Sequence, residues 1–352
     1  MRWDNLKVEQ QEGRKLAGFK DPAVVRTFDA PEALGINFYE VNARSALNQV
    51  PSQSRMPFRW TINPYRGCSH ACVYCFARPS HTYLDFNARE DFERQIVVKV
   101  NAPELLRAEL ARPSWKREHV ALGTNTDPYQ WVEGRYRLME GIWEAMRDFA
   151  NPCSVLTKSP LLLRDAELMK QIGERTEFAA NLSVPTLDEK AWRATEPHTP
   201  HPRKRLAAVA ELNRAGIPTG ILIAPLMPGV NDSPRQVEEI LELAEEAGAV
   251  SVGGVGLHLR GEVREIWFDW LRQHRPDLLP RYEELYERGA YLPSAERERL
   301  SGMAKRGDRA GRFRGRDPAP GRERPEREVR SEGRDRSRRA RAPAPPAQAK
   351  LF

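Results

Sequence analysis

The sequence has few cysteines and no long hydrophobic run. Four cysteines among 352 residues are too few for the disulfide framework of a small secreted protein. No stretch of about 18 apolar residues occurs, and the first segment, MRWDNLKVEQQEGRK, lacks the apolar centre of a signal peptide. We therefore expect a cytoplasmic protein that has no membrane partner.

Most of the chain also lacks net positive charge, although the whole carries +7. Residues 301–352 hold 16 basic and 7 acidic side chains, a net of +9, which leaves 40 basic and 42 acidic side chains in the other 300 residues. The first 300 residues are thus close to neutral. The basicity of the whole chain therefore gives no evidence for a nucleic-acid-binding face on the folded part.

Aliphatic residues are almost missing from 303–352, which is rich in Arg, Gly and Pro. Such a segment cannot bury enough apolar surface to offset the entropy lost on ordering, so we predict a disordered tail. Its arginines would attract the phosphates of a nucleic acid, or the tail would only keep the protein soluble. The composition favours neither role.

The pattern of residues 59–275 predicts an α/β fold. Short apolar runs alternate there with amphipathic stretches, which is typical of strand-helix units around a parallel sheet. We predict strands within 59–67, 119–127, 153–159, 177–184, 219–228 and 251–260, with a seventh at 96–100. Helices are expected before Gly216, from Ser233 and Pro234 onward, and over 263–271, with their apolar stripes in the core. Residues 1–58 have no strong periodicity and are assigned to an amino-terminal extension, and 276–302 to a helical segment.

Three cysteines, Cys68, Cys72 and Cys75, stand at spacings of four and three residues. Such a short loop lets three thiolates converge on one metal centre. A structural zinc site or an electron-transfer cluster needs a fourth ligand, and Cys153 follows 78 residues later inside a predicted strand. We interpret Cys153 as a buried apolar residue, so one metal position is expected to stay open. The alternative is a Cys3His zinc site completed by His70 or His81.

These residues resemble the radical S-adenosylmethionine (SAM) superfamily, whose signature is CxxxCxxC with an aromatic residue, here Tyr74, before the last cysteine. The resemblance extends from 59 to 270 and is closest to the spore photoproduct lyase-like, or DNA repair photolyase-like, branch. The motifs that carry it are TINPYRGCSHACVYCFARPSHTYL, GTNTDPYQ, VLTKSPLLLRD, NLSVPTLDE, EPHTPHPRKRL and APLMPGVND. Several dispersed motifs in one order are far more specific than CxxxCxxC alone.

The resemblance implies a partial (β/α)6 TIM barrel with a 4Fe-4S cluster at its mouth. Cys68, Cys72 and Cys75 would hold three irons, and the fourth would chelate SAM. One electron, from a donor such as flavodoxin or ferredoxin, would break SAM into methionine and a 5′-deoxyadenosyl radical that takes hydrogen from the substrate. The protein would bind and orient these groups and exclude water.

Ligands of parallel barrels bind at the carboxyl ends of the strands, where several candidate SAM contacts stand. The candidates are Tyr74, Thr126, Lys158, Ser183 and Ala224. The Lys158 cation matches the SAM carboxylate, and Thr126 would bond the methionine end. By resemblance, Ala224 lies where family members pass the adenosine, and Tyr74 presents its backbone to adenine. A strand-end cap is the alternative role for each polar residue.

Two positions depart from the lyase itself. Aligned on GTNTD, Thr124 stands where the lyase has a cysteine hydrogen donor, and Phe76 stands where it has a tyrosine of its radical relay. We therefore expect a radical SAM enzyme that abstracts hydrogen from an unidentified substrate. The alternatives are a lyase that reverses DNA lesions and a non-catalytic, zinc-stabilised protein that binds nucleic acid.

Overall fold

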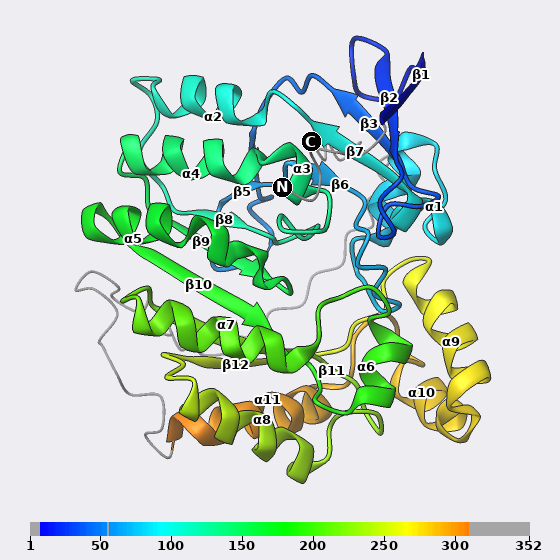
Figure 1. The fold of residues 1–352 in the computed structure, drawn as a ribbon. Coiled ribbons are helices and arrows are strands. Elements are labelled where there is room, and N and C mark those ends of the chain that lie inside the picture. Colours follow the sequence, from blue (N-terminus) through cyan, green and yellow to red (C-terminus); the bar gives the residue numbers. More distant parts are fainter. Residues whose placement is uncertain (1–7, 55, 310–352) are drawn as a thin grey trace, which may run out of the picture. The chain divides into compact units, whose positions relative to one another are not determined.

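The predicted parallel strands form one open sheet. The computed structural model describes residues 8–54 and 56–309. The larger sheet has the order β12-β11-β10-β9-β8-β5-β4 (Figure 1). Its strands are β4 (Leu47–Gln49), β5 (Trp60–Ile62), β8 (Val120–Leu122), β9 (Cys153–Thr157), β10 (Phe178–Ser183), β11 (Thr219–Leu226) and β12 (Val252–Gly256). All pairs are parallel except β4 with β5. The six predicted barrel strands are confirmed, and the sheet is not closed.

Helices connect successive strands of this sheet. They are α3 (Glu133–Tyr136) and α4 (Leu138–Asp148) after β8, α5 (Ala166–Arg175) after β9, α6 (Glu189–Thr195) and α7 (Pro202–Arg214) after β10, and α8 (Pro234–Glu246) after β11. The predicted start of α8 is confirmed, because the Ser233 side chain accepts the N–H of Gln236 and Pro234 is the first helical residue. α7 ends just before Gly216, whose φ of 82° suits a glycine.

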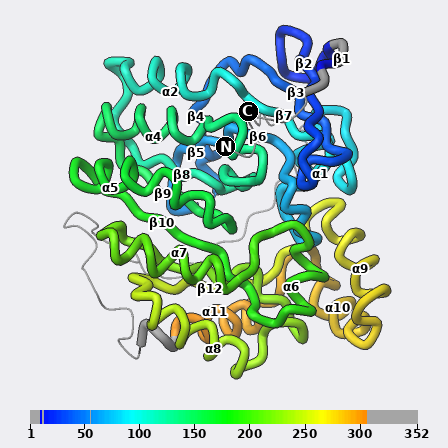
Figure 2. Tube along the Cα trace, in the orientation of Figure 1, coloured from blue at the N-terminus to red at the C-terminus, as the bar shows by residue number. Residues whose placement is uncertain are grey.

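The chain after β12 folds back along the sheet. It contains α9 (Val263–His274), η3 (Pro276–Leu278), α10 (Leu279–Leu285) and α11 (Ser294–Arg309). α9 lies beside α6 (Figure 2), where the Trp270 indole donates to the Ala194 carbonyl oxygen at 2.8 Å. α11 continues to Arg309, so the predicted disorder is wrong for residues 303–309. Met303 and Ala304 are buried in the main hydrophobic core, which holds this part of the helix in place. A Cβ at Gly254 of β12 would lie 2.7 Å from that of Ala304, so glycine allows the helix to approach the strand closely.

A second sheet stands beside the barrel sheet and uses residues assigned to the amino-terminal extension. Its order is β1-β2-β3-β7-β6. The strands are β1 (Val8–Arg14), β2 (Ala23–Phe28), β3 (Asn37–Val41), β6 (Tyr65–Arg66) and β7 (Gln95–Lys99). The seventh predicted strand thus exists as β7, but it pairs with β3 and β6 outside the barrel. Ile96, Val97 and Val98 are all fully buried, since both faces of β7 are covered.

The sequence also predicts a disordered carboxyl-terminal tail and no membrane-spanning segment. The predicted disordered tail falls, from residue 310 onward, outside the described residues. Within the part that is described, no helix is both long enough and apolar enough to cross a bilayer.

Candidate functional site

The three cysteines lie on one loop after β5 and β6, at the carboxyl edge of the barrel sheet. Cys68 and Cys72 are buried, and Cys75 is half-buried. Burial raises the pKa of each thiol, and for Cys68 the neighbouring Asp127 and the other two thiols act in the same direction. The Cys68 thiol is therefore close enough to the other two sulfurs for their charge to affect its pKa. Without a metal all three are held as neutral thiols, and a metal centre would bind them with loss of their protons.

The three cysteines of the loop are not arranged around one shared metal ion in this structure. No three His, Cys, Asp or Glu side chains within the described ranges are placed to hold one ion together. A cluster requires a wider arrangement, because each cysteine binds a different iron atom. Both histidines of the zinc alternative have other contacts. The His81 Nε2 is 2.8 Å from the Gln95 carbonyl oxygen, and the His70 Nδ1 is 3.3 Å from Asp127.

Backbone geometry and one arginine hold this loop in shape. Gly67, just before Cys68, has a φ of 81°, and a Cβ there would stand 2.8 Å from the Phe92 carbonyl oxygen. The buried Arg78 guanidinium donates to the carbonyl oxygens of Cys72, at 3.0 Å, and Ala71, at 3.1 Å. Three further acceptors of the same guanidinium are the carbonyl oxygens of Ala88 and Arg89 and the Glu93 carboxylate. Arg78 thus ties the loop to the segment before α1 (Glu90–Arg94).

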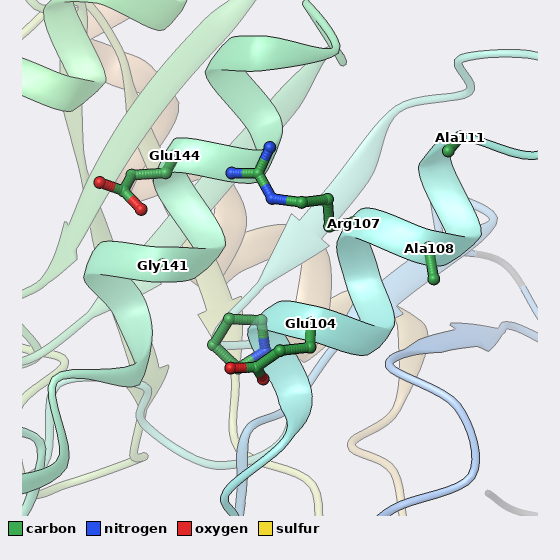
Figure 3. Close-up of a pocket in the computed structure, with 7 residues that line it drawn as sticks. Glu104, Arg107, Ala108, Ala111, Gly141 and Glu144 are labelled. Atoms are coloured by element: carbon green, nitrogen blue, oxygen red, sulfur yellow. The ribbon is translucent and has the colours of Figure 1, made fainter.

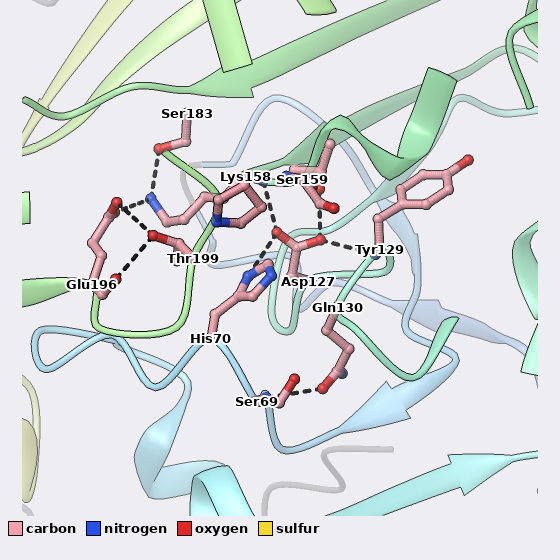
Figure 4. A network of polar contacts seen from close by, with 12 residues as sticks. Ser69, His70, Asp127, Tyr129, Gln130, Lys158, Ser159, Ser183, Glu196 and Thr199 are labelled. Atoms are coloured by element: carbon pink, nitrogen blue, oxygen red, sulfur yellow. Dashed lines mark hydrogen bonds and ion pairs between the residues drawn. The ribbon is translucent and has the colours of Figure 1, made fainter. Parts of the chain in front are cut away.

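Asp127 joins the cysteine loop to β8 and β9. Its carboxylate accepts the Thr157 hydroxyl at 2.6 Å and the Lys158 amide at 2.7 Å, and it pairs with His70 of the loop at 3.3 Å (Figure 4). Burial acts to raise the pKa of Asp127, but the charge of His70 and these hydrogen bonds outweigh it, and the pKa is lowered. An ionised carboxylate here holds the loop at the ends of two strands.

A second network crosses the ends of β9, β10 and β11. The Lys158 ammonium lies 2.8 Å from Glu196 and donates to the Ser183 hydroxyl at 2.8 Å (Figure 4). Ser183 in turn donates to the Ala224 carbonyl oxygen at 3.0 Å. The ammonium also stands 5.7 Å from the centre of the Tyr74 ring, between the second and third cysteines. A cation, a hydroxyl and a cysteine-loop aromatic therefore meet at one place.

The structure brings four of the five candidate SAM contacts into this network. Tyr74, Lys158, Ser183 and Ala224 are linked as described. Thr126 lies four residues beyond the end of β8, and its hydroxyl donates to the Tyr65 carbonyl oxygen at 2.8 Å, with no contact to the other four. Its observed role is a backbone cap.

Glu196 and Arg205 are, with Arg78 and Asp127, residues of the site that sequence analysis missed. The side chains of Glu196 and Arg205 are fully buried and pair at 2.6 Å. The segment EPHTPHPRKRL that contains them served only as a mark of resemblance. A glutamate and an arginine nine positions apart, flanking a proline-containing loop, gave no spacing signal for a metal or a substrate site.

Cys153 stands at the other end of the sheet. It is the first residue of β9 and pairs in register with Val120 and Phe178, the first residues of β8 and β10. It is fully buried, and burial raises the pKa of its thiol. Cys153 is thus about 13 Å along the strand from the end that carries Thr157.

An open groove between α2 (Ala102–Leu110) and α4 lies on the outer helical layer (Figure 3). Arg107 and Glu144 project at its rim. At its floor the two helices approach each other closely, because a Cβ at Gly141 of α4 would stand 2.9 Å from that of Pro103 of α2. Arg107 is paired with Asp148 at 2.8 Å. The groove holds no group from the cysteine loop or the strand ends, so it belongs to helix packing.

An open parallel sheet with its polar and cysteine side chains gathered at the strand ends is the arrangement of a partial-barrel protein with its functional site at the mouth. The family model described as Radical SAM superfamily matches residues 62–247, more than half of the chain. The chain belongs to this superfamily, whose membership implies SAM and an iron-sulfur cluster.

Relatives extend this similarity over most of the chain. An uncharacterized protein of Mycobacterium tuberculosis is 47% identical over 285 residues, which cover 81% of this chain and 84% of that protein. An uncharacterized protein of Methanocaldococcus jannaschii is 27% identical over 203 residues, covering 56% of this chain and 70% of its own. Among solved structures, spore photoproduct lyase complexed with dinucleoside spore photoproduct matches with a TM-score of 0.56 at 14% identity, covering 78% of this chain and 79% of that one. This last likeness is one of fold alone.

Proposed function

We propose that this protein is an enzyme that reductively cleaves SAM at a 4Fe-4S cluster and uses the resulting radical to abstract hydrogen from an unidentified substrate. The observation that carries the proposal is the position of the cysteine loop. Cys68, Cys72 and Cys75 stand at the end of the first barrel strand, and Lys158, the cation that matches a SAM carboxylate, lies 5.7 Å from the Tyr74 ring of the same loop.

The bound cluster and SAM would supply the electron transfer and the 5′-deoxyadenosyl radical. The residues of this chain would hold and shield them. Cys68, Cys72 and Cys75 would bind three irons, and the Lys158 ammonium would bind the SAM carboxylate. Ser183 would keep that ammonium in place, and Ala224 and the backbone of Tyr74 would border the adenosine. A small redox protein such as flavodoxin or ferredoxin would deliver the electron.

Burial supports this assignment of roles. Cys68, Cys72, Tyr74 and Ser183 are each less than a tenth exposed, so little water reaches them. Arg78 holds the loop through hydrogen bonds of 3.0 and 3.1 Å, and Asp127, itself bonded to Thr157 and Lys158, holds it through an ion pair with His70 at 3.3 Å. A rigid and shielded site is what an enzyme needs to direct a reactive radical toward one substrate atom.

The test is anaerobic reconstitution with iron and sulfide, followed by dithionite and SAM. The wild-type protein should bind one 4Fe-4S cluster per chain and form 5′-deoxyadenosine. Substitution of Cys68, Cys72 or Cys75 by Ala should abolish both properties. Cys153→Ala is the matched control and should retain both, because that thiol lies at the opposite end of β9. Colourless protein with stoichiometric zinc would overturn the proposal and support the zinc-stabilised alternative.

A further inference from the structure

Glu196 holds a central position between the cysteine loop and the strand ends. Its side chain is 0% exposed. One carboxylate oxygen, Oε1, accepts the Tyr74 hydroxyl and lies 2.8 Å from the Lys158 ammonium. The other, Oε2, accepts from Arg205 at 2.6 Å and from the Thr199 hydroxyl at 3.3 Å. The two oxygens thus have separate tasks, one toward the site and one toward the scaffold.

Arg205 fixes Glu196 from behind. Its guanidinium donates to the Ser183 carbonyl oxygen at 2.8 Å, to Pro200 at 2.9 Å and to Thr199 at 2.6 Å, besides Glu196. The segment is also joined to the cysteine loop by its backbone, since the Val73 amide donates to the Thr195 carbonyl oxygen at 3.0 Å. Glu196 is therefore a rigidly held hydrogen-bond acceptor, and a side chain that bonds to it is held in a defined orientation.

Lys158 is the side chain whose position Glu196 determines. A lysine ammonium has three hydrogens to donate. Glu196 and Ser183 each take one at 2.8 Å. Across residues 8–54 and 56–309 no other acceptor contacts this nitrogen, which leaves its third hydrogen for a ligand. The side chain is 15% exposed, so it is not sealed from the mouth of the barrel.

The positive charges of this network outnumber its negative charges, which also favours an anionic ligand. Lys158 and Arg205 are two cations, and Glu196 is the single carboxylate that bonds to both. These three side chains by themselves have a surplus of one positive charge, and a buried group of charges is more stable when it is balanced. An anionic ligand group at Lys158 would act in that direction, as would the deprotonated cysteines of a bound cluster. Glu196 does not need to release Lys158 for this, since the third hydrogen is available.

We infer that Glu196 is a positioning residue, which acts through Lys158 to orient that ammonium toward the carboxylate of SAM. The inference rests on the proposed function, because it takes SAM as the ligand. It adds a role for Glu196 and for its anchor Arg205. Without the carboxylate, Lys158 would be held by Ser183 alone and would adopt several rotamers, so binding of a ligand carboxylate would lose its preorganised partner.

The experiment is equilibrium binding to the anaerobic, cluster-loaded protein, with SAM and with decarboxylated SAM, which lacks the carboxylate. Glu196→Gln keeps the size of the side chain and an acceptor for Tyr74 but removes the charge. We expect it to weaken SAM binding about tenfold and to change the affinity for decarboxylated SAM less than twofold. The matched control is Glu189→Gln, since Glu189 is an exposed glutamate of α6 paired only with Arg193 in the described structure; both affinities should stay as in the wild type.

If Glu196 had only a structural role, its substitution would weaken the binding of SAM and of decarboxylated SAM equally, and that result would overturn the inference. So would a loss of SAM affinity on Glu196→Gln that persists undiminished in a Lys158→Met background, because a residue that acts through Lys158 has no effect once Lys158 is gone. If Glu196→Gln does not fold, Glu196→Asp is tested instead. Its shorter carboxylate keeps the charge but cannot reach both Lys158 and Arg205. Equal loss of affinity for SAM and for decarboxylated SAM would again refute the inference. Wild-type protein that binds no SAM would instead refute the proposed function.

Discussion

The Arg78 guanidinium donates to the carbonyl oxygen of Cys72 at 3.0 Å and so ties the centre of the cysteine loop to the η1 helix (Arg78–Leu84). The side chain is 5% exposed, and four more acceptors surround it. These contacts orient backbone that would otherwise be free to move away from a metal centre. The position of the three thiols therefore depends on a residue that is not itself a ligand.

Arg78→Gln should destabilise the protein and reduce cluster retention. It leaves up to three buried carbonyl oxygens and one partly buried carbonyl oxygen without a donor, which we expect to cost about 2 to 4 kcal/mol. Urea unfolding of the metal-free protein and iron per chain after gel filtration are the measurements. Arg89→Gln is the matched control, because that arginine is half exposed in a surface pair with Asp269 and should cost less than about 1 kcal/mol. Equal stability of the two variants would contradict the role of Arg78.

Acid should destabilise the fold through His81. Burial lowers the pKa of His81 to about 4 from its ordinary 6.5, and Arg66 acts in the same direction. Between pH 6.5 and 4, His81 is protonated in the unfolded chain but neutral in the folded chain. The stability present above pH 6.5 is therefore lost as the pH falls toward 4. The loss from this group should reach about 1 kcal/mol by pH 5.5.

The measurement is urea unfolding of the metal-free protein between pH 7.5 and 5.5. His81→Gln keeps a donor for the Gln95 carbonyl oxygen and should flatten the pH dependence by that amount. His198→Gln changes an exposed histidine and should leave the slope as in the wild type. An unchanged slope in His81→Gln would show that the group titrates alike in both states.

Removal of residues 310–352 should leave the enzyme intact. α11 continues to Arg309, so the cut belongs there and not at residue 303. The removed segment has 13 basic and 6 acidic residues, and its loss should reduce any salt-dependent affinity for nucleic acid. Cluster content, 5′-deoxyadenosine formation and the salt dependence of DNA binding are measured together. Truncation after Pro293 should instead unfold the region of β12, since it removes the buried Leu300 and Ala304.

The protein should repair spore photoproduct poorly. The lyase that the sequence resembles returns a hydrogen atom to its product from a thiol, and the O–H bond of Thr124 is too strong to replace one. We expect no hydrogen donation from Cys153, because it lies at the opposite end of β9. Reduced enzyme incubated with the dinucleotide lesion should release few thymines per SAM consumed. Many clean turnovers per SAM would contradict this, and Cys153→Ala would then show whether that thiol is the donor.

The barrel was predictable because its strands are local. Each of the six is a short apolar run between turn signals, and Ser233 with Pro234 marks a helix start by side-chain chemistry alone. The cysteine spacing is equally local, and it indicates a metal centre without any knowledge of the fold. The strands of residues 8–49 escaped because their polar residues break any simple alternation, and they are stabilised by pairing with β7 and β5, which only the folded chain provides.

The sequence by itself determined the superfamily, the six parallel strands and the three cysteines, since each is encoded in residues close together along the chain. The tertiary structure alone decided which distant residues support them. Lys158 pairs with Glu196, and Glu196 with Arg205, because the segments after β9 and β10 converge at one sheet edge. Cys153 is separated from the other cysteines because it is the first residue of β9, at the end of the strand opposite the site. Contacts between segments depend on register and burial, which no local pattern records.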